Sequence, residues 1–154
     1  MIGLTDRERA LATMMSSLRP GGWLLVEDAD PQLQPLTCLD ERGPREQLVN
    51  RLKRDFRPLL VQRGVDVAFG RTLPHQLCAH GLSNVGADAY FPVGGPRCAE
   101  LELRTLDQIA ARLLEAGLAT TDEIAMHREA IESGELDFAT SPLISAWGQR
   151  PPTP

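Results

Sequence analysis

The sequence predicts an α/β fold in which helices are interleaved with about three strands. Apolar residues recur at helical spacing in several segments, and three apolar or alternating runs of strand length stand between those segments. Apolar residues make up 42% and charged residues 24% of the 154 residues, close to globular averages, so the chain can bury one core. We therefore expect a layered sheet with flanking helices.

The first helix is expected to begin at Thr5, because Thr5 and Glu8 form a capping box that satisfies amides left free at a helix start. Residues 20–22, Pro-Gly-Gly, end this helix. One buried face is formed by apolar residues at the i, i+3, i+4 and i+7 spacing, namely Leu11, Met14, Met15 and Leu18.

The run from Trp23 to Val26 is apolar without polar alternation, which is typical of a strand covered on both faces, as in a parallel sheet between helices. Three acids, Glu27, Asp28 and Asp30, follow at once. Ligands of such sheets bind beyond the carboxyl ends of the strands, so these acids are candidate substrate-binding residues. The alternative is that an acid here only caps a turn.

Residues 31–44 are rich in proline and glycine and are predicted to form a loop. A helix should begin at about Arg45, and Pro58 should kink or restart it, because proline removes an amide donor. A further helix is predicted from about Arg71 to His80, where Gly81 ends it.

The second half begins with a strand over 84–91, where apolar residues alternate with period two. After a break at 92–96, a helix is expected over about 105–116 and ends at Gly117. A second capping box at 120–123 starts another helix, which stops at Gly134. The apolar run 142–148 is the last predicted strand, before a proline-rich tail.

Charge and composition argue against several classes of partner. The net charge is −5, whereas proteins that bind the nucleic-acid backbone are usually positively charged, so we expect no nucleic-acid partner. No run of about 18 apolar residues and no secretory signal pattern is present, so we expect no membrane span and a cytoplasmic protein. Three widely spaced cysteines suit reduced thiols better than disulfides.

Four basic residues gather in the predicted helix after Arg45: Arg51, Lys53, Arg54 and Arg57. They could form a local patch for anions. On an amphipathic helix the more common alternative is a solvated face, which we expect here.

Two segments resemble class I S-adenosylmethionine-dependent methyltransferases, especially bacterial small-molecule methyltransferases. Residues 18–28 (LRPGGWLLVED) are similar to the helix end, Pro-Gly-Gly turn and fifth strand of that family, and residues 140–148 (TSPLISAWG) to its final antiparallel strand. The resemblance implies the C-terminal half of a methyltransferase domain over 1–150. It also implies a partial Rossmann-like sheet whose last strand is antiparallel, a helical acceptor-side insertion at 31–84, and a disordered tail at 151–154.

The resemblance implies S-adenosylmethionine as cofactor and a small molecule as methyl acceptor. In the family, the cofactor sits on a glycine-rich turn after the first strand, and that part would precede Thr5. No cofactor-binding residue is therefore predicted in this chain. The fifth strand would lack one neighbour, so we expect an unpaired edge and association, either with a second copy or with a missing N-terminal half. The alternative function is a non-catalytic remnant acting in association or regulation.

Candidate catalytic bases lie in the acceptor-side region that the resemblance implies. His75 and His80 have the side chain whose ordinary pKa suits proton removal near neutrality, although both could be ordinary surface or packing histidines. Tyr90 and Trp147 could stack on an aromatic acceptor, but lone aromatic residues in strands usually pack in a core. The spacing of histidines and cysteines matches no zinc pattern, so no metal site is predicted.

Overall fold

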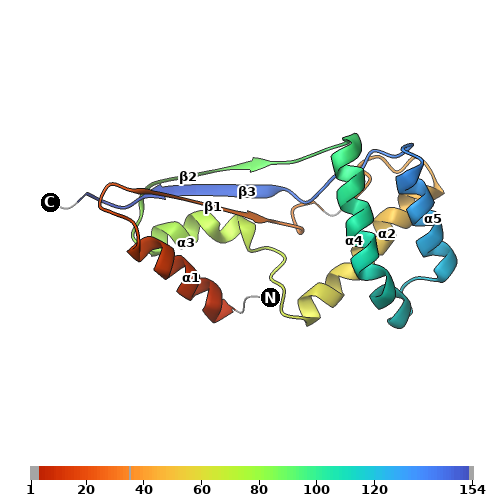
Figure 1. Cartoon of the computed structure of the whole chain (residues 1–154), viewed down its shortest axis with the longest axis horizontal. Coiled ribbons are helices and arrows are strands. Elements are labelled where there is room, and N and C mark those ends of the chain that lie inside the picture. The colour runs from red at the N-terminus through yellow and green to blue at the C-terminus, as the bar shows by residue number, and fades with distance from the viewer. Residues whose placement is uncertain (1–3, 35, 153–154) are drawn as a thin grey trace.

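The computed structural model describes residues 4–34 and 36–152, with side chains from Asp6 onward, and has the predicted α/β order of elements (Figure 1). Three strands form one sheet, and helices flank it. In chain order the elements are α1 (Leu4–Ser16), β1 (Trp23–Ala29), α2 (Pro44–Gln62), the short 3-10 helix η1 (Gly70–Thr72), α3 (Leu73–Ala79), β2 (Ser83–Tyr90), α4 (Gly95–Glu115), α5 (Thr121–Glu132) and β3 (Leu143–Gln149).

The strand order is β1-β3-β2, and β3 runs antiparallel to both neighbours. The prediction that the last strand is antiparallel is confirmed, whereas the parallel sheet suggested by residues 23–26 is wrong. β1 pairs with β3 from Trp23 opposite Gln149 to Ala29 opposite Leu143. The Pro-Gly-Gly turn extends this pairing, because Gly21 donates to the Arg150 carbonyl at 2.9 Å and Arg150 donates to Gly22 at 2.8 Å.

One face of the sheet is covered and the other is open. α1 and α3 lie on the same face (Figure 1), where Leu11, Leu73 and Leu77 pack with Ala146 of β3. On the opposite face Trp23 is 55% and Leu25 is 65% exposed. The prediction that this strand is covered on both faces is therefore wrong. Successive side chains of a strand point to opposite faces, and the helices cover only the face toward which Leu24 and Val26 point.

β1 is also an edge strand. Within the described residues it pairs only with β3, so its outer backbone edge has no strand partner. An unpaired edge is expected at this strand from the sequence analysis. Such an edge can accept a strand from another polypeptide segment.

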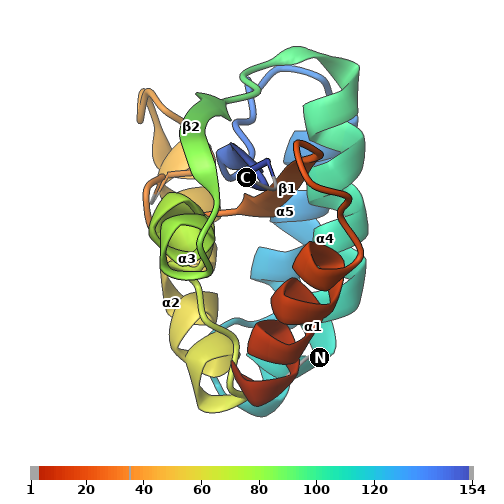
Figure 2. The same cartoon turned by 90° about the vertical axis from the view of Figure 1, so that its left-hand side faces the viewer.

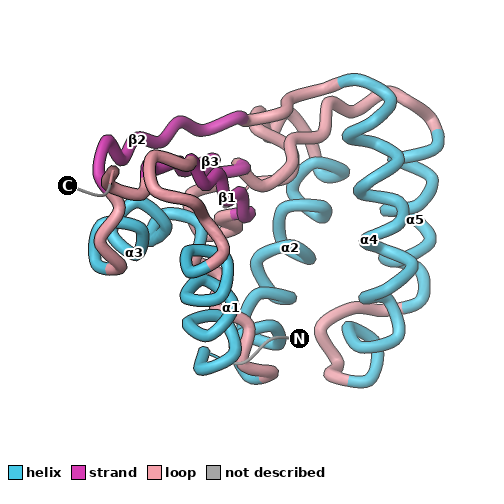
Figure 3. Tube along the Cα trace, turned by 60° about the vertical axis from the view of Figure 1, so that its left-hand side comes forward, coloured by secondary structure: helices cyan, strands magenta, loops and turns pink. Residues whose placement is uncertain are grey.

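The second part of the fold is a group of three helices, α2, α4 and α5, which stand together at one end of the sheet (Figures 1 and 3); Figure 2 looks along the sheet toward that end. Their cores are built around Val49, Leu106 and Ile131 and around Leu52, Ile109 and Leu113. None of the helices within 4–152 has an apolar stretch long enough to cross a membrane.

Several helix boundaries differ from expectation, and one is confirmed. The capping box before α5 is present, with Glu123 donating its amide to Thr120 Oγ1 at 3.2 Å. α1 already includes Leu4 and Thr5, so the helix begins before the predicted cap at Thr5. α2 runs through Pro58 without restarting. α4 begins at Gly95, far before Thr105, because Pro96 fits a first helical turn, where its missing N–H costs nothing.

Candidate functional site

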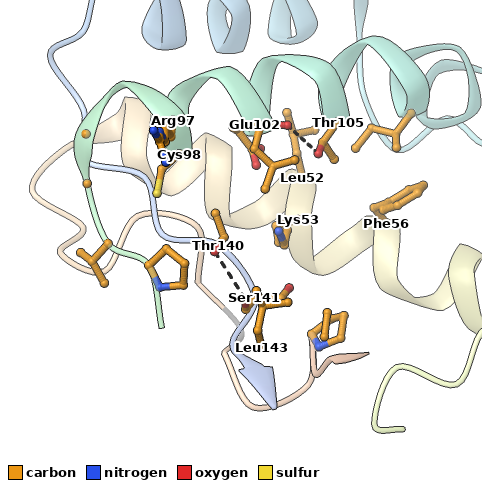
Figure 4. A pocket seen from close by; sticks show the side chains of 18 of the residues that line it. Leu52, Lys53, Phe56, Arg97, Cys98, Glu102, Thr105, Thr140, Ser141 and Leu143 are labelled. Carbon is orange, nitrogen blue, oxygen red and sulfur yellow. Dashed lines mark hydrogen bonds between the residues drawn. The ribbon is translucent and has the colours of Figure 1, made fainter. Parts of the chain in front are cut away.

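A cavity of about 710 Å³ lies between α2 and α4, at the end of the sheet where β1 and β2 finish and β3 begins (Figure 4). This is the carboxyl end of β1, the place where the sequence predicted a ligand. The cavity is lined by residues of α2 (Leu52, Lys53, Phe56, Arg57, Leu60), of α4 and the preceding turn (residues 92–98, Leu101, Glu102, Thr105, Ile109), of α5 (His127), and of the strand ends (Ala29, Pro31, Tyr90, Thr140, Ser141, Leu143).

The walls of the cavity are mainly apolar. Leu52, Phe56 and Ile109 are buried side chains that also belong to the core between α2 and α4. Leu101 on α4 is 53% exposed and lies at the rim. Thr105 keeps its hydroxyl occupied, since Oγ1 donates to the Leu101 carbonyl at 2.8 Å. A surface of this kind suits the apolar body of a small molecule.

A buried polar pair, Glu102 and His127, interrupts the apolar lining. His127 is 2% exposed, and its Nε2 lies 3.3 Å from Oε1 of Glu102. Neither ring nitrogen of His127 has a partner with hydrogen-bond geometry among the described residues. Burial opposes the charge of Glu102, but His127 and the charge of Lys53 outweigh it, so the pKa of Glu102 lies below its ordinary value.

Three cationic side chains reach the cavity: Lys53, Arg57 and Arg97. Lys53 is half-buried and has no ion pair within 4.0 Å in the described part of the chain. Arg57 donates from Nη2 to the Gln34 carbonyl at 2.7 Å, while its buried Nε has no partner there. Burial lowers the pKa of Arg57.

The expectation that the basic cluster of α2 forms a solvated face is therefore wrong for most of its members. Arg54 is solvated, with a side chain 71% exposed. Arg51 instead bonds Glu123 of α5, and Lys53 and Arg57 line the cavity. The physical reason is that α4 and α5 pack across this flank of α2, which turns part of a polar helix face toward the interior.

The predicted acids lie beside the cavity but do not line it. Glu27 accepts a hydrogen bond from Ser145 on the open face of the sheet, and Asp28 accepts from the amide of Ala29 at 2.7 Å. Asp30 is fully buried and forms two hydrogen bonds of 2.6 Å with the Arg71 guanidinium.

Asp30 also accepts the amides of Gln32 and Leu33, as an acid that caps a turn does. Its hydrogen bonds with Arg71 hold the pKa of Asp30 below its ordinary value. These partners occupy both carboxylate oxygens, so Asp30 fixes the chain between β1 and η1. Of the predicted substrate-binding residues, Tyr90 lines the cavity, with 65% of its surface exposed.

The two candidate bases lie on α3 and directly after it, and neither is among the residues that line the cavity. His75 is exposed, and His80, just after α3, has Nδ1 at 2.8 Å from the Gln76 carbonyl. Neither lines the cavity, and their role as bases stays a prediction. Within 4–34 and 36–152 no group of three or more histidine, cysteine or acidic side chains is arranged to hold a metal ion.

Glu102 and His127 were not singled out by the sequence analysis, although a signal for each was present. Glu102 interrupts the apolar stripe of Cys98, Leu106, Ile109 and Leu113 on α4. His127 stands between Ile124 and Ile131 at helical spacing. A polar residue inside an apolar stripe indicates a buried polar contact, and these two side chains lie 3.3 Å apart, Nε2 to Oε1, although not with hydrogen-bond geometry.

No family model and no curated protein sequence matches this chain. One structural match is to phosphoethanolamine N-methyltransferase 2 of Haemonchus contortus, solved with phosphomonomethylethanolamine and S-adenosylhomocysteine; the TM-score is 0.40 and the identity 11%. The match covers 96% of this chain but 30% of that one, so the chain spans about 30% of its length. At this level the similarity assigns neither family nor function.

Proposed function

We propose that this chain is the acceptor-binding part of an S-adenosylmethionine-dependent methyltransferase acting on a small molecule. The observation that carries the proposal is the pairing of the two segments that resemble the family. The Pro-Gly-Gly segment leads into β1, and the closing segment contains β3, which is the antiparallel neighbour of β1. A backbone hydrogen bond from Gly21 to Arg150 extends this pairing to the turn.

The cavity supports the acceptor side of this proposal. One of its walls is α2, which lies within the 31–84 region assigned to the acceptor by resemblance. A mainly apolar cavity that holds an acceptor in one orientation supplies what a methyl transfer mainly needs, which is positioning of the nucleophile in line with the methyl group. His75 and His80 are not needed for this function of the cavity.

The described residues do not fit the methyl donor itself. The turn after β1 has no glycine, because β1 runs into Asp30 and Pro31, and Asp30 is occupied by Arg71. A Gly94-Gly95 turn does follow β2, but the amide of Gly94 is already donated to the Phe138 carbonyl at 2.9 Å. We propose that the donor's binding residues belong to another polypeptide segment, which pairs with the free edge of β1.

A labelled methyl-transfer assay tests the proposal on the protein isolated from its native cells through an affinity tag. The protein is incubated with S-adenosylmethionine labelled in the methyl group and with a small-molecule extract of the same cells. We expect label in the small-molecule fraction. Thr105→Trp, which fills the cavity, should lower the transfer at least about tenfold, since misplacement by about 1 Å can cost on the order of 100-fold.

Gln108→Trp is the matched control, because Gln108 lies on the same helix, is exposed and does not line the cavity. It should transfer label as the unmodified protein does. Absence of transfer by the unmodified protein, or equal transfer by the two tryptophan variants, would refute the proposal.

A second candidate, a non-catalytic protein that acts by association, is favoured by the open face and free edge of the sheet. Trp23, Leu25 and Tyr90 together expose large apolar side chains there. We expect light scattering to find a mass above that of one chain, and Leu25→Lys to restore the mass of one chain. Leu33→Lys, at a position 50% exposed in the turn after β1, is the control. Association together with no methyl transfer would favour this candidate.

A further inference from the structure

We propose that the cavity between α2 and α4 binds an amphiphilic anion, a small molecule with an apolar body and one carboxylate, sulfonate or phosphate group. Lys53 is the principal anion-binding residue. The identification of this molecule as the methyl acceptor rests on the proposed function above, but its binding does not.

The charge around the cavity is opposite to the charge of the whole chain. Its charged lining residues are the cations Lys53, Arg57 and Arg97 and a single acid, Glu102. The chain as a whole carries a net charge of −5. An excess of cations inside a cavity of an acidic protein attracts an anion, and the low-polarity walls strengthen that attraction.

Lys53 has the geometry of an unpaired binding group. Figure 4 shows its side chain reaching from α2 into the space between α4 and the segment of Thr140 and Ser141. No carboxylate of the described residues lies within 4.0 Å of its ammonium, although Glu102 lines the same cavity. Glu102 is instead in contact with His127, at 3.3 Å, which leaves the Lys53 ammonium available to a ligand.

Arg57 adds a second positive charge at the wall of the cavity. Its Nη2 donates to the Gln34 carbonyl at 2.7 Å, and its Nε is buried and out of reach of a ligand in the cavity. Arg57 therefore attracts an anion by its charge, and the direct contact is left to Lys53.

The apolar walls define the rest of the ligand. Leu52, Phe56 and Ile109 present a hydrocarbon surface next to the cations, and the volume of about 710 Å³ is that of an ordinary small-molecule site. A free inorganic anion would leave this surface uncovered, whereas an amphiphile covers it and gains the corresponding free energy.

Calorimetric titration with octanoate and with octanol tests the proposal, because the two probes share the apolar chain and differ in the charged group. We expect octanoate to bind one site at least about tenfold more tightly than octanol, the effect of one charge-assisted hydrogen bond. Lys53→Met should remove this preference and leave the affinity for octanol unchanged, whereas Lys53→Arg should keep it. Arg54→Met, one position along on the solvated side of α2, is the control and should bind both probes normally.

Equal affinity of the unmodified protein for octanoate and octanol would overturn the proposal without the need for any variant, as would an unchanged preference in Lys53→Met. Octanoate binding that persists in Thr105→Trp would place the probe elsewhere and overturn it as well. The measurement involves no methyl donor. Failure of the labelled-transfer assay with intact octanoate binding would therefore reject the proposed function alone, and the reverse result would reject this proposal alone.

Discussion

Asn50 is the residue whose loss should show most clearly how the loop after β1 is fastened to α2. It is 3% exposed, and its Oδ1 accepts the amides of Thr37 and Cys38, each at 2.8 Å. Its Nδ2 donates to the Cys38 carbonyl and to Glu41 Oε1, also at 2.8 Å. In Asn50→Ala the two amides and the Cys38 carbonyl lose their partner inside the protein. At about 1 kcal/mol for each group, unfolding should become easier by about 3 kcal/mol.

Urea unfolding followed by tryptophan fluorescence measures this difference. A loss of about 3 kcal/mol is a large part of the stability of an ordinary domain and should shift the midpoint strongly. Gln47→Ala, at an exposed position one turn earlier on α2, is the matched control and should stay within about 0.5 kcal/mol of the unmodified protein. A loss below about 1 kcal/mol in Asn50→Ala would contradict this expectation, because it would mean that the two amides and the Cys38 carbonyl find other partners.

Two further buried groups, Asp30 and Cys38, should govern acid stability and thiol reactivity. Arg71 lowers the pKa of Asp30 from its ordinary value of 3.8, so the stability that this pair contributes is fully present above pH 3.8 and is lost as the pH falls through the lowered pKa. Unfolding curves between pH 6 and pH 2 should therefore show a smaller acid-induced loss in Asp30→Asn; an equal loss would contradict the assignment. Burial raises the pKa of Cys38 to about 12, so iodoacetamide at pH 8 should modify the exposed Cys78 first, and mass spectrometry showing Cys38 modified in the folded protein would contradict this.

The order of helices and strands could be predicted because each element depends on the spacing of apolar residues within its own segment. The strand at 142–148 and the capping box at Thr120 depend on residues adjacent in sequence, and both are confirmed. The run from Trp23 to Val26 predicted a strand for the same reason. That strand is covered on one face only. The coverage depends on where α1 and α3 pack, and the residues of the strand itself do not indicate it.

The cavity was predictable in position but not in composition. Ala29 and Pro31 line it, as expected for a site beyond the carboxyl end of the strand. The acids of that segment accept hydrogen bonds from other parts of the protein. Asp30, for example, accepts from the guanidinium of Arg71, which lies 41 residues further along the chain. Lys53 follows the polar pattern of an exposed helix face, and only the packing of α4 against that flank makes it a cavity residue.

A calorimetric titration of S-adenosylhomocysteine into the protein isolated from its native cells, beside residues 1–154 alone, tests whether the donor's binding residues lie on another polypeptide segment. We expect micromolar binding at one site by the native protein. We expect no heat with residues 1–154, because the residues described between Leu4 and Pro152 do not fit the donor. No binding by the native protein, or binding by residues 1–154 alone, would contradict the proposed division of the methyltransferase.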